Sequence, residues 1–288
     1  MSHPSALPSG RYRRPRYAPD LPDRRWPSRT IDAAPRWCAV DLRDGNQALL
    51  EPMSPDQRLR MFRLLVALGF REIEVGFPAA VPADHDLLRR LVDDDLVPAD
   101  VSIQVITGAH PRWIERTVRA LHGARRPVVH LFTTTSELQR RVVLGTDPAG
   151  AAALAAGAAA TCLDRAAAAG VEVQLEYTMD SWTETEPEVA LRVCAAVIEA
   201  VDPTPQRPLI VNLPATVEVS TPNAFADSVE WMHRNLPRRE SLVLSLHPHN
   251  DRGTAVAAAE LGLLAGADRI EGCLFGNGER TGNVDLVT

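Results

Sequence analysis

The chain has 288 residues, of which 45% are hydrophobic, and this length suits one large α/β domain or two small ones. No apolar run is long enough to span a bilayer, and the basic, proline-rich N-terminus lacks the apolar core of a secretory signal. A net charge of −6 gives no general attraction to nucleic acid or anionic lipid, so a cytoplasmic protein without nucleic-acid or membrane partners is expected.

All 31 basic residues are arginine, because the sequence contains no lysine. Schiff-base aldolases, pyridoxal-phosphate enzymes and P-loop nucleotidases each need a lysine, so these three classes are excluded. Any carbanion chemistry would need another electron sink, for which a metal ion is the obvious choice. The cysteines are widely separated and flanked by apolar residues, which predicts buried small hydrophobes rather than disulfides or a thiolate zinc site: Cys38, Cys162, Cys194 and Cys273.

Residues 1–34 are rich in proline and arginine and have almost no apolar periodicity. This composition predicts an extended N-terminal arm rather than a folded domain. Two alternatives stay open for the arm: it docks on a partner subunit, or it is a disordered tail.

From residue 35 onward, short apolar runs alternate with longer segments of helical pattern, which predicts parallel βαβ units. Eight such strands in roughly 250 residues match a (β/α)8 TIM barrel better than an open sheet. Only about a dozen residues follow the eighth strand, so the barrel is expected to be truncated before its closing helix. The expected strands are Trp37–Leu42, Glu72–Phe77, Val101–Thr107, Val128–Thr133, Val171–Tyr177, Leu209–Leu213, Leu242–Leu246 and Arg269–Phe275, and helical segments include Pro55–Leu68, Pro111–Leu121, Ala149–Ala169, Pro187–Ala200, Asn223–Leu236 and Thr254–Ala265.

Polar residues concentrate where these strands end, which is where a TIM barrel carries its active site. His247 and His249 follow strand seven with the alternation that points both imidazoles to one side. Together with Asp44, at the end of strand one, they would make a two-histidine, one-carboxylate site for a divalent ion such as zinc, manganese or magnesium. The alternative is a pair of histidines bonded to loop backbone.

Arg43 precedes Asp44 and would bring a fixed positive charge to the same end of the barrel, where it could stabilise a developing alkoxide. A structural salt bridge is the alternative for this residue. The glycine-rich stretch Gly276–Gly282 would let the backbone approach a phosphate or thioester, although such a stretch also serves as a simple turn.

These motifs resemble the 2-isopropylmalate synthase and homocitrate synthase family. Leu42-Arg43-Asp44-Gly45-x-Gln47 is similar to its first signature, and Leu246-x-x-His249-Asn250-Asp251-x-Gly253 with Gly276-x-Gly278-Glu279-Arg280-x-Gly282-Asn283 is similar to its second. Asn212–Glu218 and Trp231–Leu236 resemble the isopropylmalate synthase branch, most strongly its long actinobacterial type. The resemblance runs from about Arg36 to Thr288 and implies a pyruvate-carboxyltransferase-like catalytic domain over residues 35–288.

The resemblance also implies roles for individual residues. It implies a metal bound by Asp44, His247, His249 and Asn283, with Arg43 activating the keto group of a 2-oxo acid. The base is left open between Glu279 and a group outside this chain. The remaining roles are a 2-oxo acid pocket lined by His130, Thr178, Asp180, Asn212 and Thr216, and an acetyl-CoA site at Gly276, Asn277, Gly278 and Arg280.

The sequence departs from the family pattern at several positions. Arg58 replaces a lysine of the first helix, which we expect to be an exposed and tolerable change. Tyr177-Thr178-Met179-Asp180 stands where relatives read Tyr-Ser-Pro-Glu, and Phe132-Thr133-Thr134-Thr135 where they read Tyr-Asn-Ser-Thr. One methylene in a pocket is worth about 1–3 kcal/mol of discrimination, so these changes bear on which 2-oxo acid fits.

The sequence therefore predicts a metal-dependent acyltransferase that condenses acetyl-CoA with a 2-oxo acid, by default 3-methyl-2-oxobutanoate, in leucine biosynthesis. A homodimer is expected from the family. Leucine feedback is not expected from this chain alone, because the regulatory domain of relatives does not follow the barrel. Two alternatives remain: a related enzyme or lyase with another acceptor, such as one making citramalate or homocitrate, and a truncated non-catalytic partner of a full-length homologue.

Overall fold

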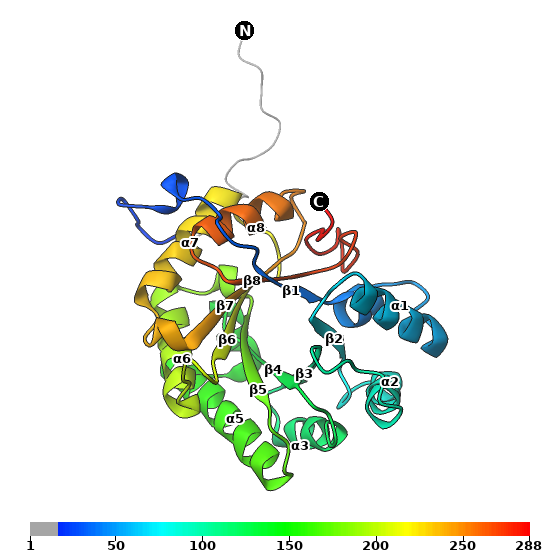
Figure 1. Ribbon diagram of the computed structural model, residues 1–288. Helices are drawn as coiled ribbons and strands as arrows, with labels where there is room; N and C mark the ends of the chain where they lie inside the picture. The colour runs from blue at the N-terminus through cyan, green and yellow to red at the C-terminus, as the bar shows by residue number, and fades with distance from the viewer. Residues whose placement is uncertain (1–16) are drawn as a thin grey trace.

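A closed barrel of eight parallel strands forms the centre of the computed structural model, which describes residues 17–288 (Figure 1). The strands follow one another in sequence order, and β1 pairs with β8 to close the barrel. This arrangement confirms the predicted TIM barrel. The strands are β1 (Arg36–Ala39), β2 (Glu72–Gly76), β3 (Ser102–Gly108), β4 (Pro127–Thr134), β5 (Gln174–Asp180), β6 (Leu209–Ala215), β7 (Leu242–Pro248) and β8 (Arg269–Gly272).

All eight strands differ from their predicted bounds by at least one residue, and β1, β5 and β8 differ most. β1 ends at Ala39 because Asp41–Gly45 form a wide helical turn, which turns the chain across the barrel mouth. β8 likewise ends at Gly272, where an added Cβ would clash with the backbone carbonyl of Val284. β5 begins and ends three residues later than expected, so Thr178 and Asp180 belong to the strand.

Helices surround the barrel and begin with proline at the first turn in most cases, where the missing N–H costs nothing. Ser54 starts the first helix with a capping box closed by Gln57. The alanine-rich stretch is one long outer helix, as expected. The helices are α1 (Pro55–Ala67), α2 (Pro82–Asp93), α3 (Pro111–Ala120), α4 (Glu137–Gln139), α5 (Pro148–Ala168), α6 (Pro187–Val201), α7 (Pro222–Asn235) and α8 (Ala255–Leu264). Within residues 17–288, no helix follows β8.

The apolar core lies between the barrel and its helices, and the four cysteines are buried and free, as predicted. Arg58 on α1 is buried at 3% exposure, so the expectation of an exposed arginine is wrong. Its guanidinium reaches beneath the helix to the carbonyls of Leu42 and Val75 and to the Asp84 carboxylate. Arg58 thus donates hydrogen bonds to backbone carbonyls at the strand ends, which would otherwise be buried without a partner.

The described part of the N-terminal arm, residues 17–34, packs on the chain's own barrel beside α7 and α8 (Figure 1). Arg24 forms a bidentate ion pair with Asp227, which also accepts the indole N–H of Trp26. The Glu230 carboxylate accepts the backbone N–H groups of Arg25 and Trp26. Residues 1–16 lie outside the described residues.

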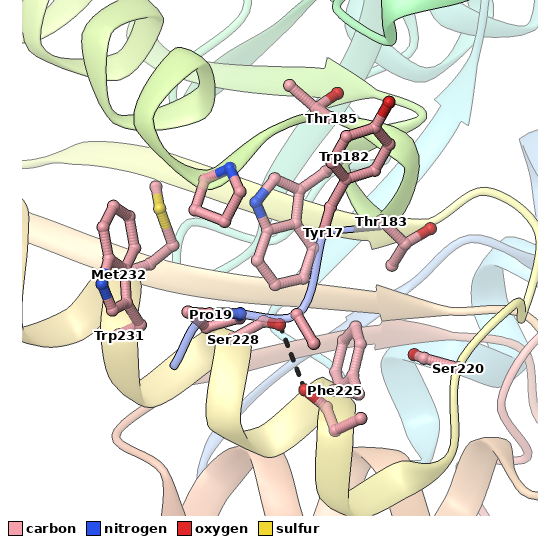
Figure 2. A pocket seen from close by; sticks show the side chains of 13 residues that line it. Tyr17, Pro19, Trp182, Thr183, Thr185, Ser220, Phe225, Ser228, Trp231 and Met232 are labelled. Atoms are coloured by element: carbon pink, nitrogen blue, oxygen red, sulfur yellow. Dashed lines mark hydrogen bonds between the residues drawn. The ribbon is translucent and has the colours of Figure 1, made fainter. Parts of the chain in front are cut away.

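Figure 2 shows the apolar groove in which the start of this segment lies. Tyr17 and Pro19 cover it on one side, and Trp182, Phe225 and Met232 form its walls. Among residues 17–288, no single helix is long and apolar enough to cross a membrane, whereas the bent pair Glu137–Leu144 and Pro148–Ala168 passes the same test together.

Candidate metal centre and active site

Three buried side chains converge at the carboxyl end of the barrel. Asp44 comes from the wide turn after β1, His247 from the end of β7, and His249 from the segment that follows. The Asp44 Oδ2 atom lies 3.3 Å from the Nε2 atom of each histidine. Their potential ligand atoms lie within 4.8 Å of one another, which is close enough to hold one ion.

The donor set fits a divalent cation. His247 Nδ1 donates to the Glu271 carboxylate at 2.8 Å, and His249 Nδ1 donates to the carbonyl of Ala215 at 3.0 Å. Both imidazoles therefore turn Nε2 toward Asp44, whose Oδ2 has no hydrogen-bond partner among residues 17–288. Once both histidines are neutral, the two Nε2 atoms and Asp44 Oδ2 offer three electron pairs to one point, and two imidazoles with one carboxylate suit first-row divalent metals.

The pKa directions of Asp44 and His247 fit a site in which a positive charge lies between these side chains. Burial opposes ionisation of Asp44, but Arg43 and the two histidines outweigh it and hold the pKa of that carboxyl well below its usual range. Burial also opposes protonation of His247, yet the facing carboxylates of Asp44 and Glu271 raise its pKa to about 10. Without metal, a proton on His247 neutralises the site, so metal binding must release it.

Arg43 lies beside the three ligands and is held on two sides. Its Nε donates to Glu74 at 2.5 Å and its Nη1 to Asp44 at 2.7 Å. Burial lowers the pKa of this guanidinium, but the facing carboxylates raise it further, so Arg43 stays charged. The two alternatives for this residue are thus compatible, because the same ion pairs fix a cation at the mouth.

A cavity of about 220 Å³ opens at this mouth. It brings together most of the residues that the sequence nominated, although they come from six different strands or strand ends. Its lining comprises Arg43, Asp44, Gln47, Ile106, His130, Phe132, Thr178, Asp180, Asn212, Pro214, Thr216, His247, His249 and Glu279.

Two hydrogen-bonded chains form part of the cavity wall. Thr178 Oγ1 lies 2.7 Å from His130 Nε2 and accepts from Asn212 Nδ2 at 3.1 Å. Thr216 Oγ1 donates to Asp180 at 2.9 Å and accepts the backbone N–H of Ser181. The wall is therefore polar but largely self-satisfied, and the side chains that set its shape are held in place.

The glycine-rich segment after β8 supports the site more than it lines it. Asn283 Oδ1 lies 2.6 Å from His247 Nε2, next to the metal ligands. Gly278 has φ +158°, and a Cβ there would lie 2.2 Å from the Asn283 amide. Arg280 is paired with Asp251 and with the carbonyl of Thr216. Of Gly276, Asn277, Gly278, Glu279 and Arg280, only Glu279 lines the cavity.

Sequence reasoning missed the polar groups inside the barrel beneath the mouth. These residues are Glu74, Gln104, Arg269 and Glu271, each with 0% exposure. A charged or amide residue flanked by apolar ones within a strand, as in Ile73-Glu74-Val75 and Ile270-Glu271-Gly272, was the available signal. Such a residue points into the barrel while its neighbours face the helices.

A second group with ligand spacing lies among these interior residues, comprising His130, Glu176 and Glu271. Neither carboxylate oxygen of Glu176 has a hydrogen-bond partner within the described part of the chain. Burial, reinforced by the charge of Glu271, raises the pKa of Glu176 to about 8. The Arg269 guanidinium already lies 3.3 Å from Glu176 and 2.8 Å from Glu271, so a cation occupies this place and the group is a poor metal site.

The fold and site define a (β/α)8 barrel with a candidate two-histidine, one-carboxylate metal centre at its mouth. The family model described as HMGL-like matches residues 34–288, and the chain belongs to this family. It is 58% identical over 287 residues to 2-isopropylmalate synthase of Parafrankia sp. and 59% identical over 268 residues to that of Rhizobium meliloti. These alignments cover 99% and 93% of this chain but 51% and 48% of the relatives, so the chain spans about half their length.

Solved structures share the fold at lower identity. Hydroxymethylglutaryl-CoA lyase from Pseudomonas aeruginosa aligns with a TM-score of 0.65 and 19% identity, covering 88% of this chain and 82% of that one. The lyase from Brucella melitensis gives 0.66 and 16%, with 88% and 87% covered. At such identities the likeness supports the barrel architecture alone.

Proposed function

We propose that this chain is the catalytic barrel of a 2-isopropylmalate synthase, a metal-dependent acyltransferase of leucine biosynthesis. It condenses acetyl-CoA with 3-methyl-2-oxobutanoate and hydrolyses the thioester, which gives 2-isopropylmalate and CoA. The observation that carries the proposal is the convergence of Asp44, His247 and His249 beside Arg43. The names of the similar proteins support the choice of reaction.

Each mouth residue has a role in this chemistry. A divalent ion held by Asp44, His247 and His249, with Asn283 as a further ligand, would act as a Lewis acid that makes the keto carbon electrophilic. Arg43 faces the same position and stabilises the negative charge that develops on the keto oxygen when the carbon nucleophile attacks. His130, Thr178, Asp180, Asn212 and Thr216 bind the remainder of the 2-oxo acid.

Glu279 is our candidate for the base that removes a proton from the acetyl-CoA methyl group. Its carboxylate is half-exposed at the cavity rim and accepts from Gln47, which also donates to Asp44. An exposed carboxylate can exchange its proton with water between turnovers, as a general base must. The adjacent segment Gly276–Gly278 with Arg280 is proposed to contact acetyl-CoA.

The test is CoA-thiol release from acetyl-CoA with a panel of 2-oxo acids, with and without added Zn²⁺, Mn²⁺ or Mg²⁺. Metal-dependent release that is fastest with 3-methyl-2-oxobutanoate supports the proposal. No release with any acceptor contradicts an independently active barrel. Release that returns on adding a full-length homologue would identify a non-catalytic partner subunit.

A different 2-oxo acid acceptor is the second candidate. Thr178 carries one more methyl group than the serine of related sequences, and Asp180 has one methylene fewer than their glutamate, and both line the cavity. A methylene changes discrimination by about 1–3 kcal/mol, which is enough to alter the preferred acceptor. The same panel decides between the two, because the best acceptor is read directly from kcat/KM.

We also propose a homodimeric, cytoplasmic enzyme. Light scattering coupled to size-exclusion chromatography tests the oligomeric state, and fractionation of cells producing the protein tests its location.

A further inference from the structure

Glu271 on β8 connects the barrel interior to the metal centre. It is fully buried, and its Oε2 lies 2.8 Å from Nδ1 of His247. A carboxylate accepts only, so this contact places a proton on Nδ1 and makes Nε2, which faces Asp44 and Asn283, the nitrogen available to a metal ion. The carboxylate thus sets both the tautomer and the rotation of the ring.

Three donors hold the Glu271 carboxylate itself. Arg269 Nη1 and Gln104 Nε2 donate to Oε1 at 2.8 Å and 2.9 Å, and Asn212 Nδ2 donates to Oε2 at 3.1 Å. All three donors are buried at 0% exposure. With both oxygens engaged, Glu271 cannot rotate away from His247 without leaving buried donors unpaired.

The second histidine is oriented differently. His249 Nδ1 donates to the neutral backbone carbonyl of Ala215 at 3.0 Å. A carboxylate partner makes the opposite ring nitrogen a stronger donor to metal than a carbonyl partner does. The two imidazoles are therefore not equivalent, and His247 gains both orientation and basicity from the interior.

We propose that Glu271 is a positioning residue for the metal centre, which it controls through His247. The proposal rests on the metal site of the proposed function, because it concerns the affinity with which Asp44, His247 and His249 hold an ion. Arg269 and Gln104 contribute by fixing Glu271, and they touch no metal ligand. Glu271 does not itself line the cavity, which it reaches through His247 and Asn212.

The experiment measures Zn²⁺ affinity of metal-stripped protein by competition with a chromophoric chelator. Wild type is compared with Glu271→Gln and Glu271→Ala, and with the control Glu72→Gln. Glu72 is a suitable control because it also pairs with Arg269, at 2.7 Å, but contacts no metal ligand. Loss of either carboxylate removes one partner of the same buried guanidinium.

We expect Glu271→Gln to bind Zn²⁺ about 10- to 100-fold more weakly, the usual cost of removing a group that orients a metal ligand. Glu271→Ala should bind more weakly again, because it removes the acceptor as well as the charge, and Glu72→Gln should stay within about twofold of wild type. Equal affinity of Glu271→Gln and wild type overturns the proposal. Equal weakening by Glu72→Gln also overturns it, since that result would trace the effect to the interior charge balance.

His247→Ala separates failure of this inference from failure of the proposed function. If wild type binds Zn²⁺ and His247→Ala does not, the metal site stands, and the Glu271 variants then decide the inference alone. If wild type and His247→Ala bind Zn²⁺ alike, the metal site itself is wrong. Imidazole ¹⁵N NMR of the zinc-loaded protein adds an independent readout, because an Nε2–H tautomer at His247 contradicts the role assigned to Glu271.

Discussion

The mouth of the barrel and its interior are both polar, buried and highly charged, but they differ in how their polar atoms are paired. In the interior, Arg269 donates close hydrogen bonds to Glu72, Glu271, Ser245 and Gln104, and Glu176 is the exception because neither of its carboxylate oxygens has a hydrogen-bond partner in residues 17–288. At the mouth, Asp44 Oδ2 faces two histidine nitrogens and has no hydrogen-bond partner in residues 17–288.

This difference indicates that the interior supports the structure and that the mouth carries the chemistry. A buried network whose hydrogen bonds are formed holds its side chains in place. Lone pairs that face one another with no hydrogen-bond donor between them instead provide a place for a metal ion. Glu271 belongs to the first group and reaches the second through His247. Changes at the mouth should therefore affect metal binding and turnover, and changes in the interior should affect stability first.

Asp44→Asn should produce the largest effect on activity. It removes the charged ligand shared by both histidines, and the several kcal/mol that a Lewis acid supplies correspond to a loss on the order of 10³-fold in kcat/KM. The measurement is CoA release together with Zn²⁺ affinity. Asp41→Asn is the control, because Asp41 lies in the same turn but accepts the backbone N–H of Leu274 instead of facing the histidines. Full activity of Asp44→Asn would contradict the claim that the mouth, rather than the interior, carries the chemistry.

Arg269→Met should produce the largest effect on stability. It leaves Glu72, Glu176 and Glu271 buried without their shared cation, and breaking a buried ion pair costs about 3–5 kcal/mol in unfolding free energy. Urea unfolding measures it. Arg36→Met is the matched control, because Arg36 also pairs with Glu72 but its side chain is 41% exposed, so its loss should cost about 1 kcal/mol or less. Equal costs would show that burial does not distinguish the two arginines.

Arg43→Lys should lower kcat with a smaller change in stability. Lysine keeps the charge but cannot bridge Glu74 and Asp44 through one planar group, so the cation is no longer fixed at the keto oxygen. Loss of one such preorganised donor costs about 10²- to 10³-fold in kcat. Steady-state kinetics with saturating metal tests this. An unchanged kcat would reduce Arg43 to a structural ion pair.

Glu176→Gln should change how stability depends on pH. Burial raises the pKa of Glu176 from the usual 4.5 to about 8, so the folded protein keeps a proton that the unfolded chain loses above pH 4.5. The stability contribution of this group is therefore complete at low pH and is lost as the pH rises toward 8. Glutamine mimics the protonated carboxyl and should remove this dependence.

Urea unfolding of wild type and Glu176→Gln at pH 5, 7 and 9 provides the comparison. The difference in unfolding free energy should grow in favour of the variant between pH 5 and pH 9. A difference that is the same at all three values would mean that Glu176 is ionised throughout, despite its unpartnered oxygens.

The barrel could be predicted because alternating apolar runs and helical patterns specify parallel βαβ units locally. The mouth could be predicted because polar residues gather at the strand ends, such as Arg43 and Asp44 after the first strand and His247 and His249 at the seventh. The ion pairs of the interior could not be predicted, because the pairing of Arg269 with Glu72 joins residues 197 positions apart and depends on the closure of the barrel. Arg58 was misjudged for a similar reason, because its carbonyl partners belong to neighbouring strand ends rather than to its own helix.

The most direct test of the metal centre is a crystal structure of zinc-loaded protein with anomalous data collected at the zinc edge. We predict one strong peak bounded by Asp44 Oδ2 and the Nε2 atoms of His247 and His249, at distances of about 2.0–2.2 Å. A peak instead between His130, Glu176 and Glu271, or none at the mouth, would contradict the account.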